Sequence, residues 1–264
     1  MSRTSDPMPK SGLNPAIDPA VPEAWKTPSY ATNGFRKLEL NPDANNRVVF
    51  HSQPGSVAVE QYRLLRRNLA ESFPQGATLL VTSPTKGDGK TVNAVNLAWC
   101  LAETHAPTLL AEADLRQPSI AKVLGFRPDH GIETAMIGEI DPESTVAVCT
   151  NGVPFHVAAV CNAQRDPIWV LKSNSTKSYL EWARSKFRWV ILDCPPVIPA
   201  ADVAELAPLA DAVLLVVRVR STPTDLVQKS FKMLGDRVRG VILNEATLCW
   251  DSYYRYLSRY HAAK

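Results

Sequence analysis

A lysine and a threonine follow two closely spaced glycines in the segment Thr82-Ser-Pro-Thr-Lys-Gly-Asp-Gly-Lys-Thr91. Glycines let successive backbone N–H groups turn toward a bound anion. Lys90 would then reach the β- and γ-phosphates of a nucleotide, and the Thr91 hydroxyl would bind Mg²⁺. The segment therefore predicts a phosphate-binding loop whose nucleotide contacts come from Gly87, Asp88, Gly89, Lys90, Thr91 and Val92.

The loop departs from the standard G-x-x-x-x-G-K-[ST] pattern at its first glycine, where Pro84 stands. A chance G-x-G-K-T sequence is the alternative interpretation. The surroundings favour the phosphate loop, because an apolar run at 77–82 predicts a buried strand before it and residues 90 to about 103 predict a helix after it. That order places the positive end of a helix beside the phosphates.

Three carboxylates follow two further predicted strands. Glu112 and Asp114 come after the run at 107–111, and Asp193 comes after the run at 189–192. Ligands of open α/β sheets bind at the carboxyl ends of the strands, so we expect all three acids to converge on the phosphates. Each acid alone could be a helix cap or part of a solvated turn. Together they indicate a metal-assisted site, with Asp193 as the Walker B acid, and the lack of an NKxD motif favours ATP over GTP.

The elements that must position these residues alternate along the chain. Apolar runs of strand length are found at 77–82, 107–111, 155–160, 189–192, 212–219 and 240–243, with helical patterns between them, notably at 202–209 and 225–234. Apolar strands separated by helices are typical of a mostly parallel sheet with helices on both faces. We therefore expect one α/β domain of the P-loop NTPase class over residues 48–247.

Composition excludes several classes of protein. The 264 residues include 29 basic and 26 acidic side chains, a balance too even for a dedicated nucleic-acid binder, so no nucleic-acid partner is expected. The 5 cysteines form no CxxC pair, which argues against a disulfide scaffold and a zinc ribbon. No apolar run approaches the ~20 residues of a membrane span, and residues 1–7 carry no signal-peptide core. We expect a cytoplasmic protein that meets a membrane only through a partner.

Two segments fall outside the expected domain. Residues 1–47 are proline-rich and polar, which predicts a disordered leader, with a short linear motif as the less favoured alternative. Residues 248–264 hold four tyrosines, namely Tyr253, Tyr254, Tyr256 and Tyr260. Tyr253, Tyr256, Leu257 and Tyr260 have the spacing of one helix face, so an aromatic helix packed on the domain is one interpretation of this tail.

These motifs together resemble the bacterial tyrosine kinases of capsule and exopolysaccharide systems, a P-loop branch related to the MinD and ParA ATPases. The resemblance runs from about residue 56 to 244. Residues 84–91 are similar to the family's Walker A motif, 109–118 to its LLIDADLRRP segment, 193–197 to its DxPPV motif and 240–244 to its GVVLN strand. It implies ATP and Mg²⁺ as cofactors. The implied catalytic residues are Lys90, Glu112, Asp114 and Asp193, the implied metal ligands Thr91, Glu112 and Asp193, and the implied adenine contact Asn244.

The resemblance also implies assembly. Residues 60–68 are similar to the family's ExxRxxR helix, which implies ring-like self-association through Glu60, Arg63 and Arg66. A solvated helix face with an internal Glu–Arg pair is the alternative. In this family neighbouring subunits phosphorylate a tyrosine cluster, so the four tail tyrosines are the implied acceptors. The implied activator is a separate membrane chain-length protein, a polysaccharide co-polymerase, that would recruit the chain to the inner face of the membrane.

Departures from the family pattern leave more than one function open. Glu112 stands where the family has aspartate, and a shift of about 1 Å in a catalytic group can cost ~10²-fold in rate. Gln117 replaces an arginine, and residues 166–173 match the NPxELLxS motif only in part. The leading hypothesis is an ATP-dependent protein-tyrosine autokinase that regulates exopolysaccharide or capsule synthesis or export. A weak or inactive nucleotide-binding scaffold is the alternative. A MinD/ParA-like positioning ATPase is less favoured because Thr85 replaces the signature lysine.

Overall fold

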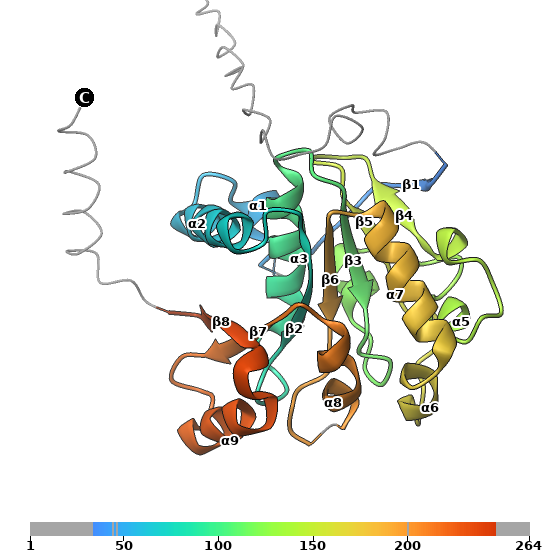
Figure 1. Ribbon diagram of the computed structural model, residues 1–264. Helices are drawn as coiled ribbons and strands as arrows, with labels where there is room; N and C mark the ends of the chain where they lie inside the picture. The colour runs from blue at the N-terminus through green and yellow to red at the C-terminus, as the bar shows by residue number, and fades with distance from the viewer. Residues whose placement is uncertain (1–33, 44, 46, 200, 247–264) are drawn as a thin grey trace, which may run out of the picture.

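A single eight-stranded sheet organises the part of the chain that the computed structural model describes, residues 34–246 without 44, 46 and 200. Its strand order is β1-β4-β5-β3-β6-β2-β7-β8, and helices lie on both faces (Figure 1). All neighbouring strands in this sheet run parallel except β4 and β5. The expected α/β fold with a mostly parallel sheet is confirmed.

The central strands are the ones that carry the loops of interest. β2, β3 and β6 are buried along their whole length, as expected for strands covered by helices on both faces. The strands are β1 (Arg36–Leu38), β2 (Ala77–Thr82), β3 (Thr108–Glu112), β4 (Ala147–Cys149), β5 (His156–Ala158), β6 (Trp189–Asp193), β7 (Ala212–Arg218) and β8 (Val238–Asn244).

The helices divide between the two faces and build two core clusters. One cluster lies between the sheet and α1 (Val49–Ser52), α2 (Val57–Ser72), α3 (Lys90–Ala102) and α4 (Ile120–Leu124). The other involves α5 (Ile132–Met136), α6 (Ile168–Leu171), α7 (Asn174–Lys186), α8 (Asp202–Leu206) and α9 (Thr224–Leu234), with the 3₁₀ turns η3 (Pro142–Thr145), η4 (Ala207–Leu209) and η5 (Gly235–Arg237) in the connections. Among the described residues, no helix has the length and apolarity that crossing a membrane requires.

The structure differs from the sequence prediction at the start of the fold. β1 lies within the segment expected to be a disordered leader, yet it pairs with β4 and its Leu38 is buried. Leu40 is buried as well, and the Asn151 side chain binds its backbone N–H at 2.7 Å and its carbonyl oxygen at 2.6 Å. The boundary at residue 47 is therefore wrong, because residues 36–40 belong to the sheet and core.

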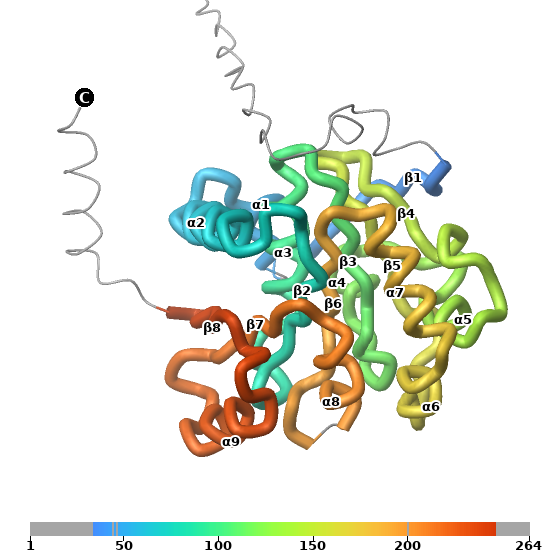
Figure 2. Tube along the Cα trace, in the orientation of Figure 1, coloured from blue at the N-terminus to red at the C-terminus, as the bar shows by residue number. Residues whose placement is uncertain are grey.

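The two ends of the described chain lie at opposite edges of the sheet. The trace enters at β1, passes through the central β2, and leaves at β8 on the far edge (Figure 2). The expected tail, residues 248–264, lies outside the described residues, as do residues 1–33 of the expected leader.

Candidate active site

The loop between β2 and α3 has the backbone conformation that a phosphate-binding loop needs. Gly87 and Gly89 have φ angles of +91° and +95°, in the region that favours glycine. α3 begins at Lys90, directly after Gly89, so the positive end of this helix opens onto the loop. A Cβ atom on Gly89 would lie 2.2 Å from Asn244 Nδ2, whereas one on Gly87 would meet open space. Glycine is thus required at position 89 for both conformation and space.

Polar contacts from the ends of β7 and β8 fix the shape of this loop. Asn244 Nδ2 donates a hydrogen bond of 2.8 Å to the carbonyl oxygen of Asp88. The buried Asp88 carboxylate accepts from the Thr85 N–H at 2.9 Å and from the Thr222 hydroxyl at 2.7 Å. Both Asp88 and Asn244 were expected to contact the nucleotide. In this structure their side chains hold the shape of the loop, and the nucleotide contact stays a prediction.

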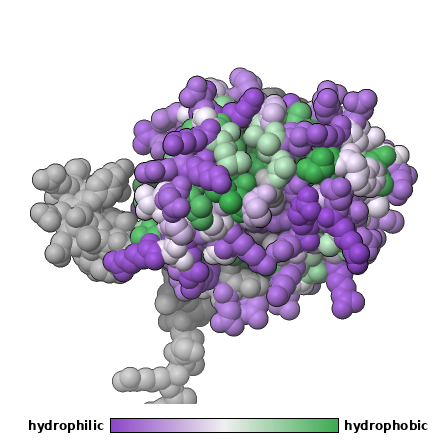
Figure 3. Space-filling view, turned by 90° about the horizontal axis from the view of Figure 1, so that it is seen from below, coloured by the Kyte–Doolittle hydropathy of each residue, from purple (hydrophilic) through white to green (hydrophobic). Residues whose placement is uncertain are grey.

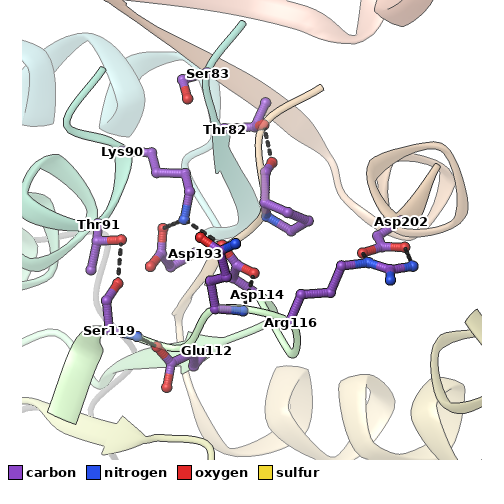
Figure 4. A network of polar contacts seen from close by, with 12 residues as sticks. Thr82, Ser83, Lys90, Thr91, Glu112, Asp114, Arg116, Ser119, Asp193 and Asp202 are labelled. Atoms are coloured by element: carbon purple, nitrogen blue, oxygen red, sulfur yellow. Dashed lines mark hydrogen bonds and ion pairs between the residues drawn. The ribbon is translucent and has the colours of Figure 1, made fainter. Parts of the chain in front are cut away.

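Three charged side chains meet beside the loop, as the sequence predicted for them. Lys90 Nζ donates to Asp114 Oδ2 at 2.8 Å and lies 3.8 Å from Asp193 Oδ1 (Figure 4). Burial lowers the pKa of Lys90, but Asp193 and Asp114 outweigh it and leave the pKa above its ordinary value. Burial raises the pKa of Asp193, and the Lys90 charge opposes the rise. The cluster therefore holds a cation between two acids where phosphates are expected.

The surroundings of Asp193 fit a magnesium site that is completed by phosphates and water. Asp193 is fully buried, and neither of its carboxylate oxygens makes a hydrogen bond. Buried acceptors without partners are rare unless an ion or water satisfies them. The Thr91 hydroxyl lies nearby and is 2.9 Å from the Ser119 hydroxyl. Mg²⁺ at phosphate sites commonly takes only one or two protein carboxylates, with phosphates and water as its other ligands.

Glu112 is not aimed at this cluster, which differs from its expected roles as metal ligand and catalytic acid. Its carboxylate turns toward α4 and accepts hydrogen bonds from the backbone N–H groups of Ser119 and of Ile120, the latter at 2.8 Å (Figure 4). The other oxygen accepts from the Val160 N–H at 2.9 Å. Burial raises the pKa of Glu112 to about 7, although these N–H groups favour the ionised form. Glu112 therefore joins the start of α4 to the end of β5.

An arginine–aspartate pair that sequence reasoning missed braces the segment after β3. Arg116 binds Asp202 through two hydrogen bonds of 2.8 and 3.1 Å. Asp202 is buried at the start of α8, and Arg116 also donates to the Arg165 carbonyl at 2.9 Å. The backbone that follows Asp114 is thus attached to α8 and to the loop after β5.

The charged residues of α2 bind within the chain. Arg63 donates to Glu60 at 2.5 Å and to Glu103 of α3 at 2.6 Å. Arg66 donates to Glu103 and to the Cys100 carbonyl, both at 2.8 Å. The internal Glu–Arg pair of the alternative interpretation is present, so these arginines connect α2 to α3. The proposed acceptors Tyr253, Tyr254, Tyr256 and Tyr260 lie outside the described residues.

Comparison with known proteins agrees with this geometry. No family model matches the chain. The putative tyrosine-protein kinase AmsA of Erwinia amylovora is 27% identical over 88% of this chain. The tyrosine-protein kinase YwqD of Bacillus subtilis is 28% identical over 79% of it, and the succinoglycan biosynthesis transport protein ExoP of Rhizobium meliloti is 29% identical over 66%. Among solved structures, the VpsO kinase domain has a TM-score of 0.66 at 27% identity and covers 75% of this chain and 99% of that one. Over most of its described length, the chain is similar to bacterial tyrosine kinases.

These relatives differ in how much of their own length this chain covers. The chain spans 33% of AmsA and 23% of ExoP, but 90% of YwqD. MinD of Pyrococcus horikoshii, solved with Mg-ADP, has a TM-score of 0.52 over 63% of this chain at 19% identity. That likeness shows a shared P-loop NTPase fold, which the bacterial tyrosine kinases and MinD therefore have in common with this chain.

Proposed function

We propose that this chain is an ATP-dependent protein-tyrosine autokinase that regulates exopolysaccharide or capsule synthesis or export. One observation carries the proposal: Lys90, Asp114 and the hydrogen-bond-free carboxylate of Asp193 converge beside a glycine-turned loop at a helix N-terminus. Such a site suits phosphoryl transfer, where catalysis is chiefly positioning and electrostatic stabilisation. The names of the relatives AmsA, YwqD and ExoP support the tyrosine-kinase activity and the link to polysaccharide.

The described residues divide the work as follows. Lys90 and the N–H groups of the loop hold the β- and γ-phosphates of ATP. Thr91 and Asp193 are the residues that would hold Mg²⁺, which offsets negative charge on the transferred phosphoryl group when bound. Asp114 accepts the proton of the attacking tyrosine hydroxyl while the new P–O bond forms and the bond to ADP breaks. Glu112 serves the site indirectly by fixing the start of α4, where Ser119 contacts Thr91.

The acceptors and partners in this proposal come from the family. Tyr253, Tyr254, Tyr256 and Tyr260 receive phosphate from a neighbouring subunit of a homo-oligomer, which is a ring if Glu60, Arg63 and Arg66 form the contact. A separate membrane chain-length protein activates the kinase and recruits it from the cytoplasm to the inner face of the membrane. ExoP, a biosynthesis transport protein by name, supports a setting in polysaccharide export.

Autophosphorylation with Mg²⁺-ATP tests the proposal. The full chain is incubated at high protein concentration, and phosphate on the tail is located by mass spectrometry. Lys90→Ala should abolish the modification. The matched control is Lys86→Ala, at an exposed lysine of the same loop. Phosphate that survives in Lys90→Ala would overturn the assignment of Lys90.

The position of Glu112 favours a second candidate, a nucleotide-binding scaffold of the same polysaccharide system. The Glu112 carboxylate accepts hydrogen bonds from three backbone N–H groups, so it does not act as a general base in the site. A scaffold would bind ATP tightly, lose that binding in Lys90→Ala, and place no phosphate on its tyrosines even with the activator segment fused to it. That combination of results would replace the kinase proposal.

A further inference from the structure

The edge strand β8 exposes apolar side chains on the sheet face that is buried at the neighbouring strand β7. Leu215 and Val217 of β7 lie in register with Val241 and Leu243 of β8. Leu215 is fully buried in the cluster that α9 helps to cover, and Val217 packs against it. Val241 and Leu243 are 44% and 59% exposed. The same face of the sheet is therefore covered at β7 and open at β8.

This open face is unusual for the rim of a sheet. Edge strands with exposed apolar side chains invite pairing and aggregation, so proteins cover or charge them. The neighbouring helix α9 also leaves Phe231 40% and Met233 55% exposed. The view from below, the side on which α8 and α9 lie, shows apolar residues at the surface among polar ones (Figure 3). We call Val241 and Leu243 the β8 face.

We propose that residues 248–260 of this chain cover the β8 face. The described chain ends at residue 246, two residues after β8, so the tail starts at the strand that needs cover. Tyr253, Tyr256, Leu257 and Tyr260 have the spacing of one helix face, and Trp250 extends the same stripe by three residues. Phenol rings suit a half-exposed site because they present an apolar body and a polar tip.

The connection is long enough for the tail to fold back on the strand. Residues 247–252 can extend over about 20 Å, and a helix over 253–260 is about 12 Å long. The distance along β8 from Val241 to Leu243 is about 7 Å. A tether of this length gives an effective concentration on the order of millimolar, which favours the chain's own tail over a second copy of the protein.

The proposed cover has a consequence that rests on the proposed kinase function. Three of the four proposed acceptors, Tyr253, Tyr256 and Tyr260, lie on the stripe that contacts the β8 face, and Tyr254 lies beside it. A phosphate adds about −1.5 to −2 charges and cannot be buried against valine and leucine. Docking and phosphorylation of the stripe tyrosines therefore exclude each other. Tyr254 is modified first, and phosphorylation of the other three releases the tail.

Hydrogen exchange of the full chain without nucleotide tests the docking. We expect amides of residues 250–260 to exchange at least about tenfold more slowly in the wild type than in Leu243→Ser. The matched control is Leu64→Ser, because Leu64 is an equally large residue, 47% exposed, on α2 at the other face of the sheet. Tyr256→Phe should keep the protection, and Tyr256→Glu should lose it.

Several outcomes would overturn the proposal. Fast exchange of the tail in the wild type would do so, as would equal protection in wild type and Leu243→Ser. Protection that rises with protein concentration, with a dimer in analytical ultracentrifugation that Leu243→Ser abolishes, would assign the β8 face to a second copy. All these measurements also work in a Lys90→Ala background, so they can fail or succeed independently of kinase activity.

Discussion

Glu112 and Asp193 are paired across two adjacent strands and are both fully buried, yet their carboxylates have opposite surroundings. Glu112 accepts three backbone hydrogen bonds, whereas Asp193 accepts none. A buried carboxylate that is already satisfied stabilises the fold, and one that is unsatisfied is available to a bound ion. The two acids therefore have different tasks, although the sequence predicted that both would converge on the phosphates.

Shortening Glu112 should cost stability. Glu112→Asp keeps the charge but draws the carboxylate back from the start of α4, which leaves buried N–H groups without partners. Each such loss is worth about 1–3 kcal/mol, so we expect the free energy of unfolding in urea to fall by that amount. Glu139→Asp, at an exposed glutamate, is the control and should change nothing. An unchanged midpoint for Glu112→Asp would show that its hydrogen bonds do not support the fold.

Glu112 should also make stability depend on pH. Its pKa is raised from 4.5 to about 7, so the folded protein holds this proton more tightly than the unfolded chain does. The stabilisation is complete below pH 4.5 and is lost as the pH rises to about 7. The free energy of unfolding of the wild type relative to Glu112→Gln should therefore fall by up to about 3 kcal/mol over that window. Urea titrations without Mg²⁺ would measure it, and a difference that rises with pH would contradict the assignment.

At the scale of elements, the phosphate loop depends on two glycines for different reasons. Both have positive φ angles, but only a side chain at position 89 would collide with Asn244. Gly87→Ala should lower the free energy of unfolding by about 1 kcal/mol through backbone strain alone. Gly89→Ala should cost at least about 1 kcal/mol more, since the Asn244 side chain must move and its hydrogen bond to Asp88 breaks. Equal losses in the two variants would show that Asn244 is not fixed against the loop.

The sequence predicted the strands that are buried along their whole length. It missed short elements that form only through contacts between residues far apart in the sequence. The runs at 77–82, 107–111 and 189–192 became the central strands because residues covered on both faces must be apolar throughout. β1 and β4 have three residues each, too few to show a period, and they pair across more than 100 positions of the chain. The cap that Glu112 gives α4 could not be predicted either, because a strand-end carboxylate has the same sequence signal whether it faces a ligand or a helix.

In the site, too, contacts between residues far apart in the sequence were hard to predict. The convergence of Lys90, Asp114 and Asp193 was predictable, since parallel strands bring their carboxyl ends to one side of the sheet. The Arg116–Asp202 pair was not, because 86 residues separate its members and only the packing of α8 brings them together. Local chemistry and strand order thus identified the charged centre, whereas the residues that brace it required tertiary structure.

At the scale of the whole molecule, Glu103 decides whether α2 is free for self-association. It binds both Arg63 and Arg66 and is only 19% exposed. If these arginines form the contact between subunits, Glu103→Gln releases them and should strengthen association severalfold in analytical ultracentrifugation. Glu71→Gln is the control, because Glu71 pairs with Arg67 on the same helix, outside the proposed contact. Unchanged association in Glu103→Gln would leave Arg63 and Arg66 as purely internal links.

At the same scale, the folded domain begins earlier in the chain than its composition suggested. Removing residues 1–33 keeps the whole described sheet and core, so that truncated protein is the reference for a longer truncation. Removing residues 1–41 deletes β1 together with Leu38, Leu40 and Phe35, whose ring lies 4.6 Å from that of His156. Burial of two leucines is worth about 3–6 kcal/mol, part of which offsets the ordering of the strand, so we expect a net loss of about 2 kcal/mol. Urea unfolding of the two truncated proteins would measure this difference. Equal stability would mean that the parallel pair of β1 and β4 adds nothing to the fold, and the domain would then begin near residue 48 as its composition predicts.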